Sequence, residues 1–209
     1  MIAAVIFDLD GVLLDSEAAW DAARRKLVRE RGGDWTERAT REMMGMSSPE
    51  WSRYLADELG VDLEPNAISD QVVERLLAAY RKALPLLPGA TNAVERLAGR
   101  WPLGLASSSN REVIDLVLQQ SGLGPRFDVS VSSEEVARGK PAPDVYEEAA
   151  RRLGATAAVC VAIEDSENGI ASAHAAGMRV IAMPNAQFPP AAKALALAER
   201  EIGSLAELT

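Results

Sequence analysis

The sequence predicts an α/β fold in which an all-helical segment interrupts a parallel sheet of five strands. Three observations lead to this prediction. Five short apolar runs alternate with stretches of helical periodicity along most of the chain. Residues 16–84 contain no convincing strand. Acidic and hydroxyl residues directly follow several of the apolar runs, at the strand ends where parallel α/β sheets bind ligands.

The first predicted strand, Ile2 to Phe7, is rich in branched residues and too short for a capped helix. It runs directly into Asp8, Leu9, Asp10 and Gly11. Because side chains alternate along a strand, Asp8 and Asp10 should project to the same side. An isolated Asp-x-Asp is more often a pair of solvated turn residues. At the end of a buried strand, however, two carboxylates repel each other, and a hard divalent cation would stabilise them.

The next part of the chain is predicted to be entirely helical. Apolar spacing and capping residues indicate four helices, at residues 17–31, 36–44, 48–60 and 66–84. A proline-rich linker at residues 84–89 then returns the chain to the sheet. We therefore predict two domains, with residues 1–15 and 88–209 in an α/β core domain and residues 16–87 in a helical domain.

From residue 90 onward, strands and helices alternate. The further strands are predicted at residues 103–106, 129–131, 159–163 and 179–183, and residues 191–198 are predicted to form a terminal helix. Ser107 follows one of these strands, and Glu164 and Asp165 follow another. Since the carboxyl ends of parallel strands share one edge, these residues should lie near Asp8 and Asp10.

Composition excludes several classes of function. The 209 residues are 48% hydrophobic and 25% charged, and no apolar run approaches the roughly 20 residues that cross a bilayer. A formal net charge of −9 argues against nucleic acid or an anionic membrane as partner. The single cysteine, Cys160, permits no internal disulfide, which fits a reducing compartment. We expect a cytoplasmic monomer without a secretory signal.

Four motifs in order resemble those of the haloacid dehalogenase (HAD) superfamily, in the subfamily with β-phosphoglucomutase and many sugar-phosphate phosphatases. Asp8 to Asp15 resembles its first motif, and Ser107 its second. Gly139-Lys140-Pro141 resembles the third, and Glu164-Asp165 the fourth. The resemblance covers essentially the whole chain. It implies a Rossmann-like core, with residues 16–87 as a helical cap over the active site.

The resemblance also implies roles for the acidic residues. Asp8 would be the nucleophile that forms an aspartyl phosphate, and Asp10 the general acid and base. Mg²⁺ would be held by Asp8, the backbone carbonyl of Asp10 and Asp165. Glu164 would act on the ion mainly through coordinated water.

The remaining implied residues bind phosphate. Ser107 and, with a weaker match, Ser108 would contact the phosphoryl group after the second strand. Lys140, between a glycine and prolines, would neutralise both the nucleophile and the phosphoryl group. The resemblance also suggests a cis peptide bond between Lys140 and Pro141, as in some relatives.

These roles imply a Mg²⁺-dependent phosphatase acting on a small phosphorylated metabolite, such as a sugar phosphate. The alternative is a β-phosphoglucomutase-like mutase, which carries a histidine where Trp20 falls and an arginine where Ser48 falls. Those differences favour the phosphatase. A less favoured alternative is a non-enzymatic HAD-like interaction protein, but its motifs should have decayed, and none has.

Other polar and aromatic residues are interpreted as structural. Trp20 is predicted to be a packing residue, close enough to the first linker to line the pocket. Arg24 and Arg25 are predicted to form a solvated helix face, and the only histidine, His174, to be a packing or surface residue.

Overall fold

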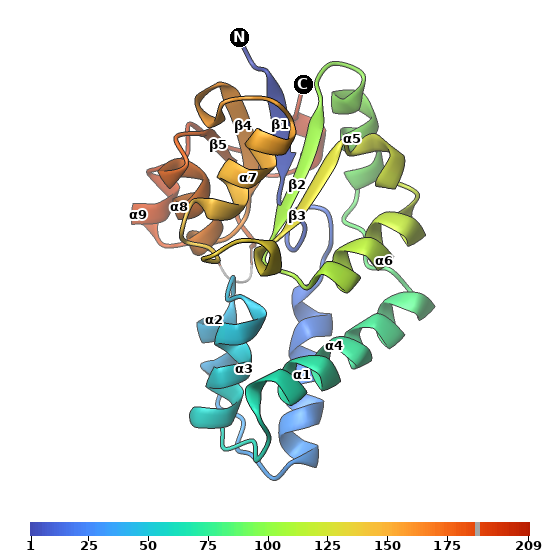
Figure 1. The fold of residues 1–209 in the computed structure, drawn as a ribbon, viewed down its shortest axis with the longest axis vertical. Helices are drawn as coiled ribbons and strands as arrows, with labels where there is room; N and C mark the ends of the chain where they lie inside the picture. The colour runs from blue at the N-terminus through green and yellow to red at the C-terminus, as the bar shows by residue number, and fades with distance from the viewer. Residues whose placement is uncertain (187–188) are drawn as a thin grey trace.

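The computed structural model describes residues 1–186 and 189–209 of the protein. Its centre is a parallel six-stranded sheet of order β3-β2-β1-β4-β5-β6 (Figure 1). The strands are β1 (Ala4–Phe7), β2 (Leu103–Ser107), β3 (Val129–Ser132), β4 (Cys160–Glu164), β5 (Arg179–Ala182) and β6 (Arg200–Glu201). The predicted α/β class is confirmed. The sheet has one strand more than predicted, because β6 is only two residues long and shows no alternation.

Helices cover both faces of the sheet. They are α5 (Ala90–Ala98), α6 (Arg111–Ser121), α7 (Asp144–Arg152), α8 (Glu167–Ala175) and the short α9 (Ala192–Leu195). Because side chains alternate along β1, its residues pack on both faces of the sheet. Ile6 lies in one apolar cluster with α7 and α8, and Phe7 lies in a second cluster with α5 and α6. The helix predicted at residues 191–198 is shorter than expected and is not terminal, because β6 follows it.

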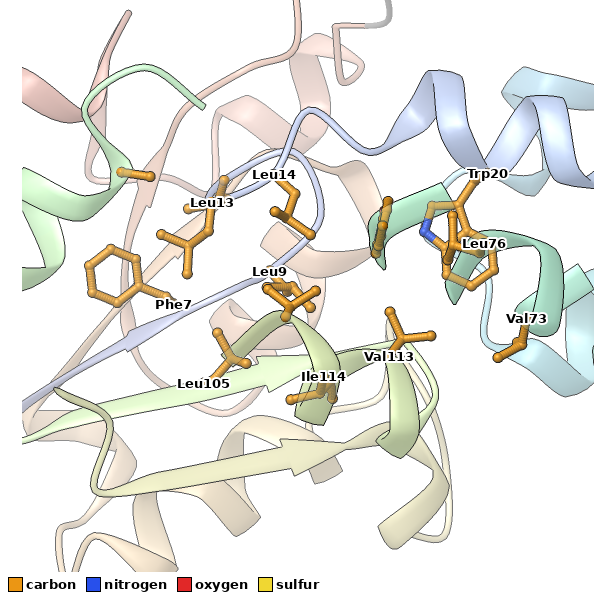
Figure 2. Packing of buried hydrophobic residues seen from close by; sticks show 14 of the residues in the cluster. Phe7, Leu9, Leu13, Leu14, Trp20, Val73, Leu76, Leu105, Val113 and Ile114 are labelled. Atoms are coloured by element: carbon orange, nitrogen blue, oxygen red, sulfur yellow. The ribbon is translucent and has the colours of Figure 1, made fainter. Parts of the chain in front are cut away.

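Helices α1 (Glu17–Glu30), α2 (Ala39–Met43), α3 (Ser48–Asp57) and α4 (Pro65–Lys82) form a separate layer beyond the carboxyl ends of β1 to β3 (Figure 1). Apolar packing continues from the sheet into this layer. Figure 2 shows Leu9 and Val113 between Phe7 on the sheet side and Trp20 and Leu76 on the helical side. No helix among the described residues is both long and apolar enough to cross a lipid bilayer.

The two linkers between the sheet and the helical layer lie side by side. The backbone N–H of Asp15 donates to the carbonyl of Pro85 (2.8 Å), and that of Leu87 donates to the carbonyl of Leu13 (2.9 Å). Leu14 and Leu86 pair between them as an antiparallel bridge. The chain therefore enters and leaves the helical layer at one hydrogen-bonded place.

Candidate active site

Three acidic side chains meet where β1 and β4 end. The two strands are parallel neighbours with Phe7 opposite Ile163, and the N–H of Asp8 extends the pairing by donating to the Ile163 carbonyl at 3.0 Å. One carboxylate oxygen from each of Asp8, Glu164 and Asp165 lies within 4.8 Å of the others. All three residues are buried. The structure thus brings together the acids that the sequence placed at neighbouring strand ends.

Lys140 contacts two members of this acid cluster, which we define as Asp8, Glu164 and Asp165. Its Nζ donates to Asp8 Oδ1 at 2.6 Å, to Glu164 Oε1 at 2.5 Å and to the carbonyl of Ala106 at 3.1 Å. The Lys140–Pro141 peptide bond is cis, as the sequence suggested. Burial by itself lowers the pKa of Lys140, but Asp8 and Glu164 outweigh it and raise the pKa above its ordinary value.

Glu164 is held on both carboxylate oxygens. Oε1 accepts from Lys140 and from the hydroxyl of Tyr146 at 2.8 Å. Oε2 accepts from the backbone N–H groups of Asp165 (3.0 Å) and Ser166 (3.2 Å). In α8, Gly169 leaves space for this carboxylate, since a Cβ there would lie 1.8 Å from Oε1. Glu164 therefore has one defined position, fixed by its neighbours.

The acid cluster carries more negative charge than Lys140 can balance. Burial raises the pKa of Asp8 to about 8. The negative charges of Glu164 and Asp10 also raise this pKa, and the positive charge of Lys140 only partly offsets the increase. Burial and the neighbouring acids also raise the pKa of Asp165 well above its usual range. Gly11, with φ of +78°, leaves room for the Asp165 carboxylate, since a Cβ there would lie 1.9 Å from Oδ2. Buried carboxylate oxygens with unbalanced charge are a donor set that suits Mg²⁺.

Asp10 is held between the two layers of the molecule. Trp20 of α1 donates from Nε1 to Asp10 Oδ1 at 3.1 Å. Ser109, which follows β2, donates from its hydroxyl to Asp10 Oδ2 at 2.6 Å. The carboxylate thus accepts one hydrogen bond from the helical layer and one from the sheet side. The sequence did not identify Ser109 as a separate site residue, and its only signal is the run of serines after the strand.

The predicted phosphate-binding serines differ in their surroundings. Ser107 is fully buried at the end of β2, and its Oγ accepts from the N–H of Ser109 at 3.0 Å. Ser108 lines the cavity between the strand ends and the helical layer, and its hydroxyl donates to the Gly45 carbonyl at 3.5 Å. Asn110 is buried and does not line this cavity, and its Oδ1 accepts from the hydroxyl of Ser48 at 2.5 Å.

The opposite wall of the cavity comes from the helical layer, and we call it the cap wall: Glu17, Trp20 and Arg24 of α1 with Trp51 of α3. The prediction that Arg24 lies on a solvated helix face is wrong, because the residue is only 5% exposed. Its guanidinium carbon lies 5.0 Å from the Trp20 ring centroid and 5.1 Å from that of Trp51. Arg24 follows Trp20 by four residues and therefore shares its buried face. Arg25 is exposed, as predicted.

A model of the haloacid dehalogenase-like hydrolase family matches residues 2–177. The chain belongs to this family. It is 35% identical to hexitol phosphatase B of Escherichia coli K12, over 100% of this chain and 95% of that protein. It is 30% identical to fructose-1-phosphate phosphatase YqaB of the same organism, over 86% and 95% of the two chains. The chain is thus a hydrolase whose curated relatives include phosphatases.

Solved HAD structures share the fold. The crystal structure of CbbY from Rhodobacter sphaeroides in complex with phosphate matches with a TM-score of 0.87 and 30% identity, over 100% of this chain and 96% of that chain. A β-phosphoglucomutase from Clostridium difficile matches with a TM-score of 0.86 and 24% identity, over 100% and 94%. The second likeness shows the common fold.

Proposed function

We propose that this HAD hydrolase is a Mg²⁺-dependent phosphatase that hydrolyses a small phosphate monoester through an aspartyl phosphate. The observation that carries the proposal is the position of Asp8, which lies against Lys140 inside the acid cluster with Asp10 two residues away. The phosphatase names of the hexitol phosphatase and fructose-1-phosphate phosphatase relatives support it.

In the proposed mechanism, a carboxylate oxygen of Asp8 attacks phosphorus, and the bond from phosphorus to the ester oxygen breaks. Asp10 protonates the departing oxygen and later takes a proton from the water that attacks the aspartyl phosphate. The hydrogen bonds from Trp20 and Ser109 hold the Asp10 carboxylate in place for both transfers. Free phosphate and an unmodified Asp8 result.

The groups around the reaction supply positive charge and donors. Mg²⁺ would be held by the carboxylates of Asp8 and Asp165 and the backbone carbonyl of Asp10, with Glu164 acting through water. When bound, it counters the negative charge of the phosphoryl oxygens. Lys140 contributes a second positive charge at the same place. We assign binding of the phosphoryl oxygens to Ser107, Ser108 and Lys140.

We further propose that residues 1–15 and 88–209 act as the core domain and residues 16–87 as a cap that closes over the substrate. Contacts between the two parts support this, including Trp20 with Asp10, Ser48 with Asn110, and the Gln120 side chain, which donates to the Tyr80 carbonyl at 2.9 Å. A closed cap leaves space for a small phosphorylated metabolite and not for a folded protein.

Trp20 favours a phosphatase over a sugar phosphate mutase. A mutase must keep its aspartyl phosphate from water until a sugar is bound, and the subfamily's mutases use a cap histidine at this position. The indole N–H of Trp20 only donates hydrogen bonds, so it cannot shuttle a proton as a histidine does. Ser48, where the mutase has arginine, is bonded to Asn110. Water should therefore reach the phosphorylated Asp8 without a second substrate.

The test is to incubate the protein with hexose and hexitol phosphates and to measure free phosphate. We expect release that requires Mg²⁺, stops with a chelator and needs no sugar bisphosphate. With β-glucose 1-phosphate, the rate of glucose 6-phosphate formation is followed alongside. If glucose 6-phosphate appeared faster than free phosphate, the phosphatase proposal would be wrong and the protein would be a mutase.

A further inference from the structure

Arg24 is a buried cation without a hydrogen-bonding partner among the described residues. Its Nε is fully buried and has no hydrogen-bond partner, and the guanidinium lies over both the Trp20 and the Trp51 rings, which also pack against each other at a centroid distance of 5.9 Å. Stacking on tryptophan rings is favourable, but it leaves the N–H donors of the guanidinium unused. Burying a charged group whose N–H donors make no hydrogen bond is costly. Because Arg24 lines the cavity, a bound ligand is the natural partner for these donors.

Glu17 is in the same situation on the same helix. Its Oε1 is buried and has no hydrogen-bond partner. Seven residues separate Glu17 from Arg24, which is close to two helical turns, so both side chains lie on the helix face that lines the cavity. The cap wall therefore offers unused donors on Arg24 and an unused acceptor on Glu17.

The charges of the cap wall balance each other. Burial lowers the pKa of Arg24, and Glu17, Asp10 and Asp21 partly offset this. The cap wall thus holds one basic and one acidic side chain, Arg24 and Glu17, whose formal charges cancel. Arg24 is the only cation of the cap wall, so nothing remains to neutralise a second anionic group of a substrate. A hydroxyl group is neutral, and it can accept from Arg24 and donate to Glu17 at once.

We propose that Arg24 and Glu17 bind hydroxyl groups of the organic part of the substrate, which is therefore the monophosphate of a neutral polyol or sugar. Bisphosphates and phosphorylated acids would be disfavoured. This inference rests on the proposed phosphatase function and adds the residues that select the substrate. The hexitol and fructose phosphates named for two relatives have organic parts of this chemistry.

The test compares Arg24→Met with Arg25→Met. Methionine keeps an apolar chain against the two tryptophan rings and removes the donors, and replacing a buried guanidinium that makes no hydrogen bond should leave the fold intact. Arg25, one residue away, is exposed and ion-paired with Asp21. We measure kcat/KM for glucitol 6-phosphate and for acetyl phosphate, a small phosphoryl donor without hydroxyl groups.

For Arg24→Met, the ratio of kcat/KM for glucitol 6-phosphate to that for acetyl phosphate should fall about tenfold, as expected for a lost hydrogen bond to a charged group. Arg25→Met should keep the wild-type ratio. An Arg24→Met ratio equal to that of the wild type would overturn the proposal.

Glu17→Gln provides a second test, because it removes the one acidic side chain of the cap wall. Its kcat/KM for fructose 1,6-bisphosphate should rise relative to that for glucitol 6-phosphate. A higher kcat/KM of the wild type for the bisphosphate than for glucitol 6-phosphate would overturn the proposal that the organic part of the substrate is neutral.

A binding measurement separates this inference from the phosphatase proposal. The Kd of glucitol 6-phosphate in Mg²⁺ is measured for Asp8→Asn with and without Arg24→Met, and it should be about tenfold weaker with the second change. If the wild-type protein released no phosphate from any ester, the proposed phosphatase function would be contradicted, but the role of Arg24 in binding would not. An unchanged Kd would contradict the role of Arg24 whatever the turnover.

Discussion

The acid cluster and the cap wall face the same cavity but are built in opposite ways. In the acid cluster, Lys140 and Glu164 use their polar atoms on each other and on their neighbours, with distances of 2.5–3.2 Å. In the cap wall, Glu17 and Arg24 each keep a buried polar atom without a partner. One side of the cavity holds its lysine and Glu164 in a hydrogen-bonded network, and the other leaves buried polar atoms without a partner.

This difference follows from what each side must do. Groups that act on phosphorus must be held in one geometry, and a buried, hydrogen-bonded network at strand ends achieves this. Groups that recognise the organic part must exchange partners when it arrives. Unpaired polar atoms in the cap wall lower the stability of the protein in return for binding, a common compromise at functional sites. The two sides should therefore respond differently to substitution.

The largest effect is expected on removing the nucleophile from the acid cluster. Asp8→Asn keeps the shape of the side chain but removes the attacking carboxylate, so turnover should fall by at least about 10⁴-fold and Mg²⁺ should bind more weakly. Phosphate release and Mg²⁺ titration measure this. Beryllium fluoride with Mg²⁺ should inhibit the wild type by mimicking the phosphorylated aspartate. Asp115→Asn, on the exposed face of α6, is the matched control. Substantial turnover in Asp8→Asn would refute the assignment.

A smaller effect is expected from crowding the acid cluster without changing any charge. Gly169→Ala should favour a helix by about 1 kcal/mol, but its Cβ would lie 1.8–2.1 Å from atoms of the Glu164 carboxylate. Since Glu164 has no room to move, we expect a net loss of about 3 kcal/mol in unfolding free energy, measured in urea. Gly99→Ala, whose Cβ would meet nothing closer than 3.6 Å, is the control. Equal stability of both variants would show that the acid cluster is not rigid.

The smallest effect concerns the cap wall and depends on pH. Burial, with help from Asp10 and Asp21, raises the pKa of Glu17 from 4.5 to about 7. Between these pH values the folded protein binds more protons than the unfolded chain, so this group makes stability fall as pH rises from 4.5 to 7. Glu17→Gln lacks this loss and should gain about 2 kcal/mol over the wild type between pH 4.5 and pH 7.5. Denaturant unfolding at both pH values measures the gain. A constant difference would mean that Glu17 is well solvated.

The acid cluster was predictable from sequence because its geometry is local to strands. Apolar runs locate the strands, and the acids follow those runs directly, so the sequence alone places Asp8 and Glu164 at one edge of the sheet. The cap wall was not predictable in the same way. Charged residues on a helix are usually exposed, and the burial of Arg24 depends on Trp51, which comes from another helix. The contact of Trp20 with Asp10 depends on how the helical layer sits on the sheet.

The paired linkers bear on how such a protein can change over generations. Asp15 and Pro85 are hydrogen-bonded neighbours, and no strand of the sheet comes from the residues between them. Deleting that stretch would leave two ends that a short turn can join, as at sites that tolerate inserted domains. We therefore expect that the four helices can be replaced as a unit, so that substrate range can evolve while the strand ends stay intact.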